Sequence, residues 1–216
     1  MNPYLKQMIS AGEGQQLDFK FEISDSKKIA RTLSAFSNTE GGTLLVGVKD
    51  NGNIAGIRSD EEYYMLEAAA QMYCKPEVSF TVREWNVDGK TVLEARIEKS
   101  STPPHYARGE EGKWTAYIRV KDENILANSI MIRVWKRRGR PTGTFVRYTL
   151  KEKILFDYLR EHEIITLSKF QRIARLNMQT AANILVNLIV LDLIDITFRD
   201  KKIVYTLADK SSPAGP

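Results

Sequence analysis

Hydrophobic and polar residues alternate between Gln16 and Ile23, which is the period of a half-buried strand. Its apolar face holds Leu17, Phe19, Phe21 and Ile23, and its polar face holds Gln16, Asp18, Lys20 and Glu22. Asp25 or Ser26 can cap a following helix that runs to about Asn38. The nearly continuous apolar run at 43–48 then predicts a strand covered on both faces.

Similar patterns predict the elements that follow, up to about residue 138. Turn residues at 50–53 and the Asp88-Gly89 pair mark two chain reversals. The expected elements are a short strand at 53–57, a helix at 60–73, strands at 78–86, 91–98 and 114–120, and a helix at 129–138. Strands and helices mixed in this order predict an α+β domain built on a mixed sheet.

The pattern changes after residues 139–144, where two Gly, one Pro and no apolar periodicity predict a linker. Three helical patterns follow, at about 150–161, after Thr166 and after Asn177, and then two strands flank the basic turn 199–202. This order is typical of a winged helix-turn-helix. The predicted organisation is an α+β domain at 1–139, a basic linker at 140–147, a small winged helix-turn-helix domain at 148–208 and a tail at 209–216.

Four motifs of the first domain occur in a recognisable order. They are Glu13-x4-Asp18-Phe19-Lys20, the SAFSNTEGG block at 34–42, the LVGVKDNG block at 45–52 closing at Gly56, and the YIRV block at 117–120. Over roughly residues 5–135 the chain resembles the Schlafen/AlbA-like DNA-binding domain of bacterial regulators. The resemblance implies DNA binding, and in that family winged-helix segments often follow this domain.

The same resemblance implies a carboxylate cluster. In Schlafen-type relatives, acidic residues at positions matching Glu13, Asp18 and Asp50 support metal-dependent RNA cleavage. Three convergent carboxylates can hold Mg²⁺ or Mn²⁺, and such a metal activates water. Lys20 lies on the strand face of Asp18, where it can meet a phosphate. Asp18 stands where the family usually has Glu, and the alternative is that it forms a solvated pair with Lys20 while Asp50 merely starts a turn.

The glycines near residue 41 allow two interpretations. Gly41-Gly42 lets a helix end and turn tightly into a buried strand, and Gly47 indicates close approach of another backbone. The other interpretation is a cradle for a nucleotide phosphate, but the sequence lacks a G-x4-G-K-[ST] loop.

Basic residues are concentrated in one segment. The chain carries 32 Lys and Arg against 27 Asp and Glu, a net charge of +5, and residues 130–153 hold eight basic residues and one acidic. The predicted nucleic-acid contacts in this segment are Lys136, Arg137, Arg138 and Arg140. The Arg-Gly-Arg-Pro run at 138–141 resembles the core of an AT-hook, which enters the minor groove; the alternative is an ordinary basic helix end.

The third helix of the second domain is the expected DNA-reading element. Its outward residues are Gln179, Thr180 and Asn183, with Asn187 one turn further on. The helix has no Lys or Arg between Asn177 and Ile194, so phosphate contacts would come from the linker and from Lys169, Arg172, Arg175, Arg199, Lys201 and Lys202. The apolar stretch 184–194 fits either a core or a protein-docking face.

Other chemistry is limited by composition. With one cysteine, Cys74, and two histidines, the sequence excludes an intrachain disulfide and a Cys-rich zinc site. No apolar run reaches the roughly 18–20 residues that span a bilayer, and no signal peptide is evident, so a cytoplasmic protein without a membrane partner is expected. The leading hypothesis is a non-enzymatic DNA-binding transcriptional regulator, a homodimer that prefers duplex DNA to RNA and needs no cofactor. The alternatives are a Mg²⁺- or Mn²⁺-dependent ribonuclease and a protein-docking module.

Overall fold

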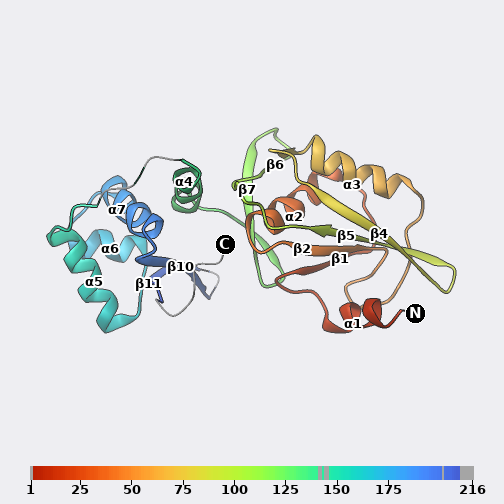
Figure 1. Cartoon of the computed structure of the whole chain (residues 1–216), viewed down its shortest axis with the longest axis horizontal. Helices are drawn as coiled ribbons and strands as arrows, with labels where there is room; N and C mark the ends of the chain where they lie inside the picture. The colour runs from red at the N-terminus through yellow and green to blue at the C-terminus, as the bar shows by residue number, and fades with distance from the viewer. Residues whose placement is uncertain (1, 141–142, 144–145, 201, 210–216) are drawn as a thin grey trace. The chain divides into compact units, whose positions relative to one another are not determined.

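The computed structural model of the chain describes residues 2–140, 143, 146–200 and 202–209. The chain divides into two compact units, Met1–Ala127 and Asn128–Pro216. Figure 1 colours the chain from red at the N-terminus to blue at the C-terminus and labels most of the helices and strands. Within the described residues, no helix combines the length and the apolar character that crossing a membrane requires.

The first unit mixes helices with strands. Its elements are α1 (Pro3–Ala11), β1 (Leu17–Lys20), α2 (Ser26–Asn38), β2 (Gly42–Val46), α3 (Glu61–Gln71), β3 (Cys74–Lys75), β4 (Phe80–Val87), β5 (Lys90–Ile97), β6 (Tyr106–Arg108), β7 (Trp114–Val120) and β8 (Glu123–Leu126). One sheet has the order β1-β2-β5-β4, with β1 parallel to β2 and the other pairs antiparallel. The second sheet, β3-β6-β7-β8, is antiparallel. The predicted α+β class with a mixed sheet is confirmed.

A hydrophobic core lies on each face of the central strand β2. Because side chains alternate along a strand, Leu44 and Val46 of β2 join a core with α2 and α3, whereas Leu45 joins a second core with Leu5 of α1. Helix α2 also packs against β7 of the other sheet, so it lies between the two sheets (Figure 1). Burial on both faces explains the continuous apolar run of β2.

The glycines around β2 allow close backbone contacts. Gly41 has φ +74°, and a Cβ there would lie 2.7 Å from the carbonyl oxygen of Ile97. Gly47 has φ +92°, and its Cβ would lie 2.8 Å from the carbonyl carbon of Gly56. These contacts exclude any side chain, which confirms the prediction of close backbone approach at Gly47.

The second unit has fewer strands. Its elements are α4 (Ser129–Arg138), α5 (Leu150–His162), β9 (Ile164–Ile165), α6 (Leu167–Ala174), α7 (Met178–Val190), β10 (Ile194–Arg199) and β11 (Lys202–Leu207). The strands form an antiparallel sheet in the order β10-β11-β9. Two predicted caps are present: Asn177 Oδ1 accepts from the Thr180 N–H at 2.8 Å, and Thr166 Oγ1 accepts from the Lys169 N–H at 3.2 Å.

Helix α4 belongs to the second unit, whereas residues 129–139 were predicted to lie in the first domain. Ile130 and Val134 lie one turn apart on α4 and are buried in the same core as Val186 and Ile189 of α7. Packing therefore divides the chain after Ala127, before the Gly- and Pro-containing segment that marked the predicted boundary.

Candidate functional site

Asp18 is buried, although the alternation of β1 predicted a solvent-facing side chain. Only 3% of the residue is exposed. Its Oδ1 accepts from an Nη2 donor of Arg119 at 3.1 Å, and its Oδ2 lies 2.9 Å from Nζ of Lys20. The predicted solvated pair of Asp18 and Lys20 is thus wrong in one respect: the ion pair forms, but its carboxylate is covered.

Arg119 of β7 accounts for this burial. It is 2% exposed, and its Nε and Nη2 donate to the carbonyl oxygens of Gly14 and Leu17 at 3.0 and 3.1 Å. Its Nη1 donates to Asn124, and its guanidinium carbon lies 5.2 Å from the centre of the Phe36 ring. Arg119 therefore joins β1 to the second sheet and neutralises Asp18. Arg119 was predicted only to be part of the YIRV strand, and the available signal of its role was an arginine inside a strand.

The three predicted metal ligands do not form a metal site. Glu13 Oε1 accepts from the Phe19 N–H at 2.8 Å, and burial, followed by the neighbouring Asp18, raises the pKa of Glu13. Asp50 lies in an exposed turn. In the described part of the chain, no group of three or more His, Cys, Asp or Glu side chains can hold a metal ion. The residues present therefore do not fit the Mg²⁺ or Mn²⁺ that the ribonuclease hypothesis requires.

Helix α7 is largely enclosed by other helices. The side chains of Leu185, Val186 and Leu188 are at most 1% exposed. Most of the apolar stretch at 184–190 thus supplies core residues, whereas Leu191 and Leu193, just beyond α7, are 38% and 39% exposed.

Polar contacts with α4 occupy part of the predicted DNA-reading face of α7. Arg133 and Arg137 of α4 donate to the side-chain oxygens of Asn183 and Asn187. Arg138 donates to the Ile189 carbonyl oxygen at 3.0 Å and pairs with Asp192. Arg137 and Arg138 are therefore engaged within the second unit, as are the two asparagines.

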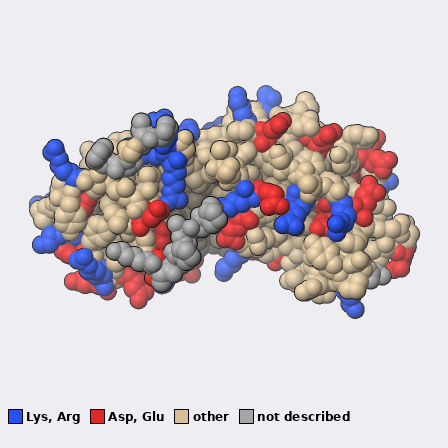
Figure 2. Space-filling view, viewed as in Figure 1, with Lys and Arg blue, Asp and Glu red and all other residues tan. Residues whose placement is uncertain are grey.

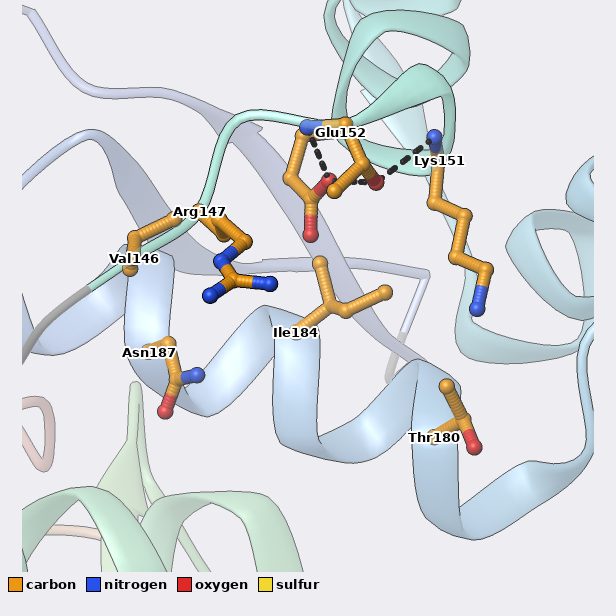
Figure 3. Close-up of a pocket in the computed structure, with 8 residues that line it drawn as sticks. Val146, Arg147, Lys151, Glu152, Thr180, Ile184 and Asn187 are labelled. Carbon is orange, nitrogen blue, oxygen red and sulfur yellow. Dashed lines mark hydrogen bonds between the residues drawn. The ribbon is translucent and has the colours of Figure 1, made fainter.

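A cavity of about 330 Å³ lies between the N-terminal turn of α5 and the flank of α7 (Figure 3). Its lining includes Arg147 and Lys151 from the α5 side and Thr180, Ile184 and Asn187 from α7. In Figure 3 the Arg147 guanidinium lies over α7, above Asn187. The Lys151 side chain points from α5 toward the end of α7 that carries Thr180.

This cavity brings positive charge to a helix that has none of its own. Arg147 and Lys151 are exposed and belong to the basic segment 130–153. Glu152, the acidic residue of that segment, is 6% exposed, and its Oε2 accepts from the Thr149 N–H at 2.8 Å in a capping box. Both cations belong to the basic segment seen in the sequence, but they were not predicted as site residues, because only the fold places them beside α7.

The other predicted cations are spread over the second unit. Arg172 and Arg175 are exposed at the end of α6 and in the turn before α7. Arg199 lies 3.8 Å from the Glu163 carboxylate, and Lys202 is exposed at the start of β11. Lys136 and Arg140 are also exposed near the end of α4. Two residues of these predictions lie outside the described residues: Lys201, and Pro141, which ends the Arg-Gly-Arg-Pro run.

Charge differs between the two units. Residues 1–127 hold 16 Lys and Arg against 19 Asp and Glu, whereas residues 128–216 hold 16 against 8. Figure 2 shows basic side chains on the visible face of the second unit. The net charge of +5 therefore originates in the second unit, and the first unit is weakly acidic.

Comparison with known proteins identifies the first unit. The family model for Schlafen, AlbA_2 domains matches residues 13–128, and no curated protein matches the chain. The DIP2311 protein from Corynebacterium diphtheriae is 19% identical over 68% of this chain and 35% of its own, with a TM-score of 0.48. The N-terminal domain of a RecG-related protein from Nitrosomonas europaea is 18% identical over 67% of this chain and 94% of its own, with a TM-score of 0.40. The chain thus spans about a third of the DIP2311 protein. Because the family model covers more than half of its residues, the chain belongs to the Schlafen AlbA_2 family.

Proposed function

We propose that this protein binds nucleic acid through its second unit, with duplex DNA as the preferred ligand, and that it serves as a transcriptional regulator. The observation that carries the proposal is the cavity where Arg147 and Lys151 lie beside Thr180 of α7. Attraction between cationic side chains and phosphates supplies much of the affinity of DNA-binding proteins. These two cations lie next to α7, the helix predicted to contact the bases.

The order of elements supports assigning residues 148–208 as a winged helix-turn-helix. Helices α5, α6 and α7 precede the β10–β11 hairpin, and the turn between α6 and α7 contains Arg175 in the left-handed conformation, with φ +51°. In such domains the N-terminal residues of the second helix of the motif contact base edges in the major groove. Gln179 is exposed and Thr180 lines the cavity, so this turn of α7 is suited to that role.

The contacts with α4 limit the number of α7 side chains that can contact bases. Because Asn183 and Asn187 are bonded to arginines of α4, base contacts are left to Thr180 and to Gln179, whose Nε2 donates to Asn183 Oδ1 at 3.4 Å. We therefore expect phosphate contacts to dominate and the sequence preference of one unit to be modest. A homodimer that binds two half-sites would raise the specificity, as in other helix-turn-helix proteins.

The test is the double substitution Arg147→Gln with Lys151→Gln. We expect weaker duplex binding and a plot of log affinity against log salt that is less steep by about 2, since each phosphate contact contributes about 0.9. The matched control is Lys99→Gln with Lys113→Gln, which removes the same charge from exposed positions of the first unit. An equal loss of affinity in the control variant would contradict the proposal.

A further inference from the structure

Strand β4 is the outer strand of the mixed sheet formed by the described residues. It pairs along its length with β5, from Phe80 opposite Ile97 to Val87 opposite Lys90. An outer strand presents a row of backbone N–H and C=O groups that the sheet does not pair. Figure 1 shows helix α3 next to β4, on the side away from β5.

A cleft of about 270 Å³ separates α3 from the first half of β4. Tyr63, Glu67 and Gln71 line it from α3, and Phe80 and Val82 line it from β4. Phe80 and Val82 are two residues apart, so they lie on the same face of the strand and are only half-buried. A groove between an outer strand and a helix is the geometry in which an extended peptide adds to a sheet as a further strand.

The charge of the cleft indicates the kind of peptide. Glu67 and Glu77 line it, and none of the described side chains lining it is Lys or Arg. The first unit as a whole is also weakly acidic. These carboxylates favour a basic ligand and repel a phosphate backbone, so this surface differs from the one in the second unit.

We propose that the cleft between α3 and β4 binds an extended, basic segment of a partner protein, which pairs as a strand with the outer edge of β4. Backbone hydrogen bonds to β4 supply affinity that depends little on sequence. Phe80 and Val82 receive apolar side chains of the segment, and Glu67 and Glu77 select for Lys or Arg.

The probe is a fluorescein-labelled ten-residue peptide of alternating Lys and Val, titrated with the full chain and followed by fluorescence anisotropy. The Glu67→Gln, Glu77→Gln double variant should bind it about fivefold more weakly, because two solvent-accessible ion pairs are lost. The matched control, Glu40→Gln with Glu111→Gln, removes the same charge from exposed positions elsewhere in the first unit and should bind as the wild type does.

Two further peptides separate strand addition from simple charge attraction. A Lys-Val peptide with N-methylated alternate amides should lose binding, and a Glu-Val peptide should not bind. The Lys-Val peptide should also slow amide exchange in residues 80–87. Absence of Lys-Val binding, equal binding by the N-methylated peptide, or equal losses in the two double variants would each overturn the proposal. Because the cleft and the basic cavity lie in different units, DNA binding should be unchanged in the Glu67→Gln, Glu77→Gln variant.

Discussion

Arg119 shows how one buried side chain can decide what neighbouring carboxylates do. Its guanidinium satisfies two backbone carbonyls, one amide and the Asp18 carboxylate, so Asp18 serves as an internal counter-ion. The sequence correctly placed Asp18 and Lys20 together on one strand face. It could not show that β7, about a hundred residues away, covers that face, because alternation reports only which residues share a face and not what packs against them.

Removing Arg119 should destabilise the protein strongly. Arg119→Leu would leave Asp18 without its buried partner, and we expect the free energy of unfolding to fall by about 3–5 kcal/mol. Urea denaturation followed by circular dichroism measures the change. Lys20 is more exposed, so Lys20→Gln should cost about 1 kcal/mol or less. Equal effects of the two substitutions would contradict the role assigned to Arg119.

Glu13 should make stability depend on pH in an unusual direction. Burial and Asp18 raise its pKa in the folded protein, so the folded state holds the proton more tightly than the unfolded state does. Stability from this group is therefore present below its usual pKa and is lost as pH rises through the raised value. Glu13→Gln, measured by urea denaturation between about pH 4 and 7, should gain stability relative to the wild type as pH rises. A difference that is constant across this range would refute the assignment.

At the scale of elements, most helices and strands follow from periodicity and capping residues. The predicted helices at 129–138 and after Asn177 are present, but their association through Ile130 and Val134 was not predicted. A Gly- and Pro-containing segment marks where helices end, whereas domain membership depends on which apolar faces pack together. The sequence therefore predicted the position of α4 along the chain but not the unit to which this helix belongs.

Helix α1 was not predicted, although its signals are present. Asn2 caps the helix, with its Oδ1 accepting from the Tyr4 N–H at 2.9 Å, and Pro3 occupies the first turn. Leu5 is its sole buried residue among those described, so an apolar periodicity is weak there.

The docking of α4 on α7 can be tested with one pair of substitutions. Ile130→Ala removes a side chain from the core of the second unit and should cost about 2–5 kcal/mol. Amide hydrogen exchange should become faster in α7 and remain unchanged in α2. The same substitution at Ile132, which is only half-buried, should cost about 1 kcal/mol or less. Equal costs at both positions would show that α4 does not pack as described.

At the scale of the whole molecule, the small total charge conceals an uneven distribution. The basic residues of the second unit exceed its acidic residues twofold, and the first unit carries an acidic cleft beside β4. The sequence located the basic segment 130–153, but only the fold shows that Arg147 and Lys151 lie beside α7. We propose that the second unit binds DNA and that the first unit binds a peptide segment.

The most direct test of DNA binding is a titration of the full chain with random duplex DNA, single-stranded DNA and structured RNA over a salt series. Contacts by about four or five cations of the second unit predict a slope of log affinity against log salt near −4 for duplex DNA. Duplex DNA should bind more tightly than the other two ligands, and the RNA should remain intact. Tighter binding of RNA, or duplex binding that does not weaken with salt, would contradict the account.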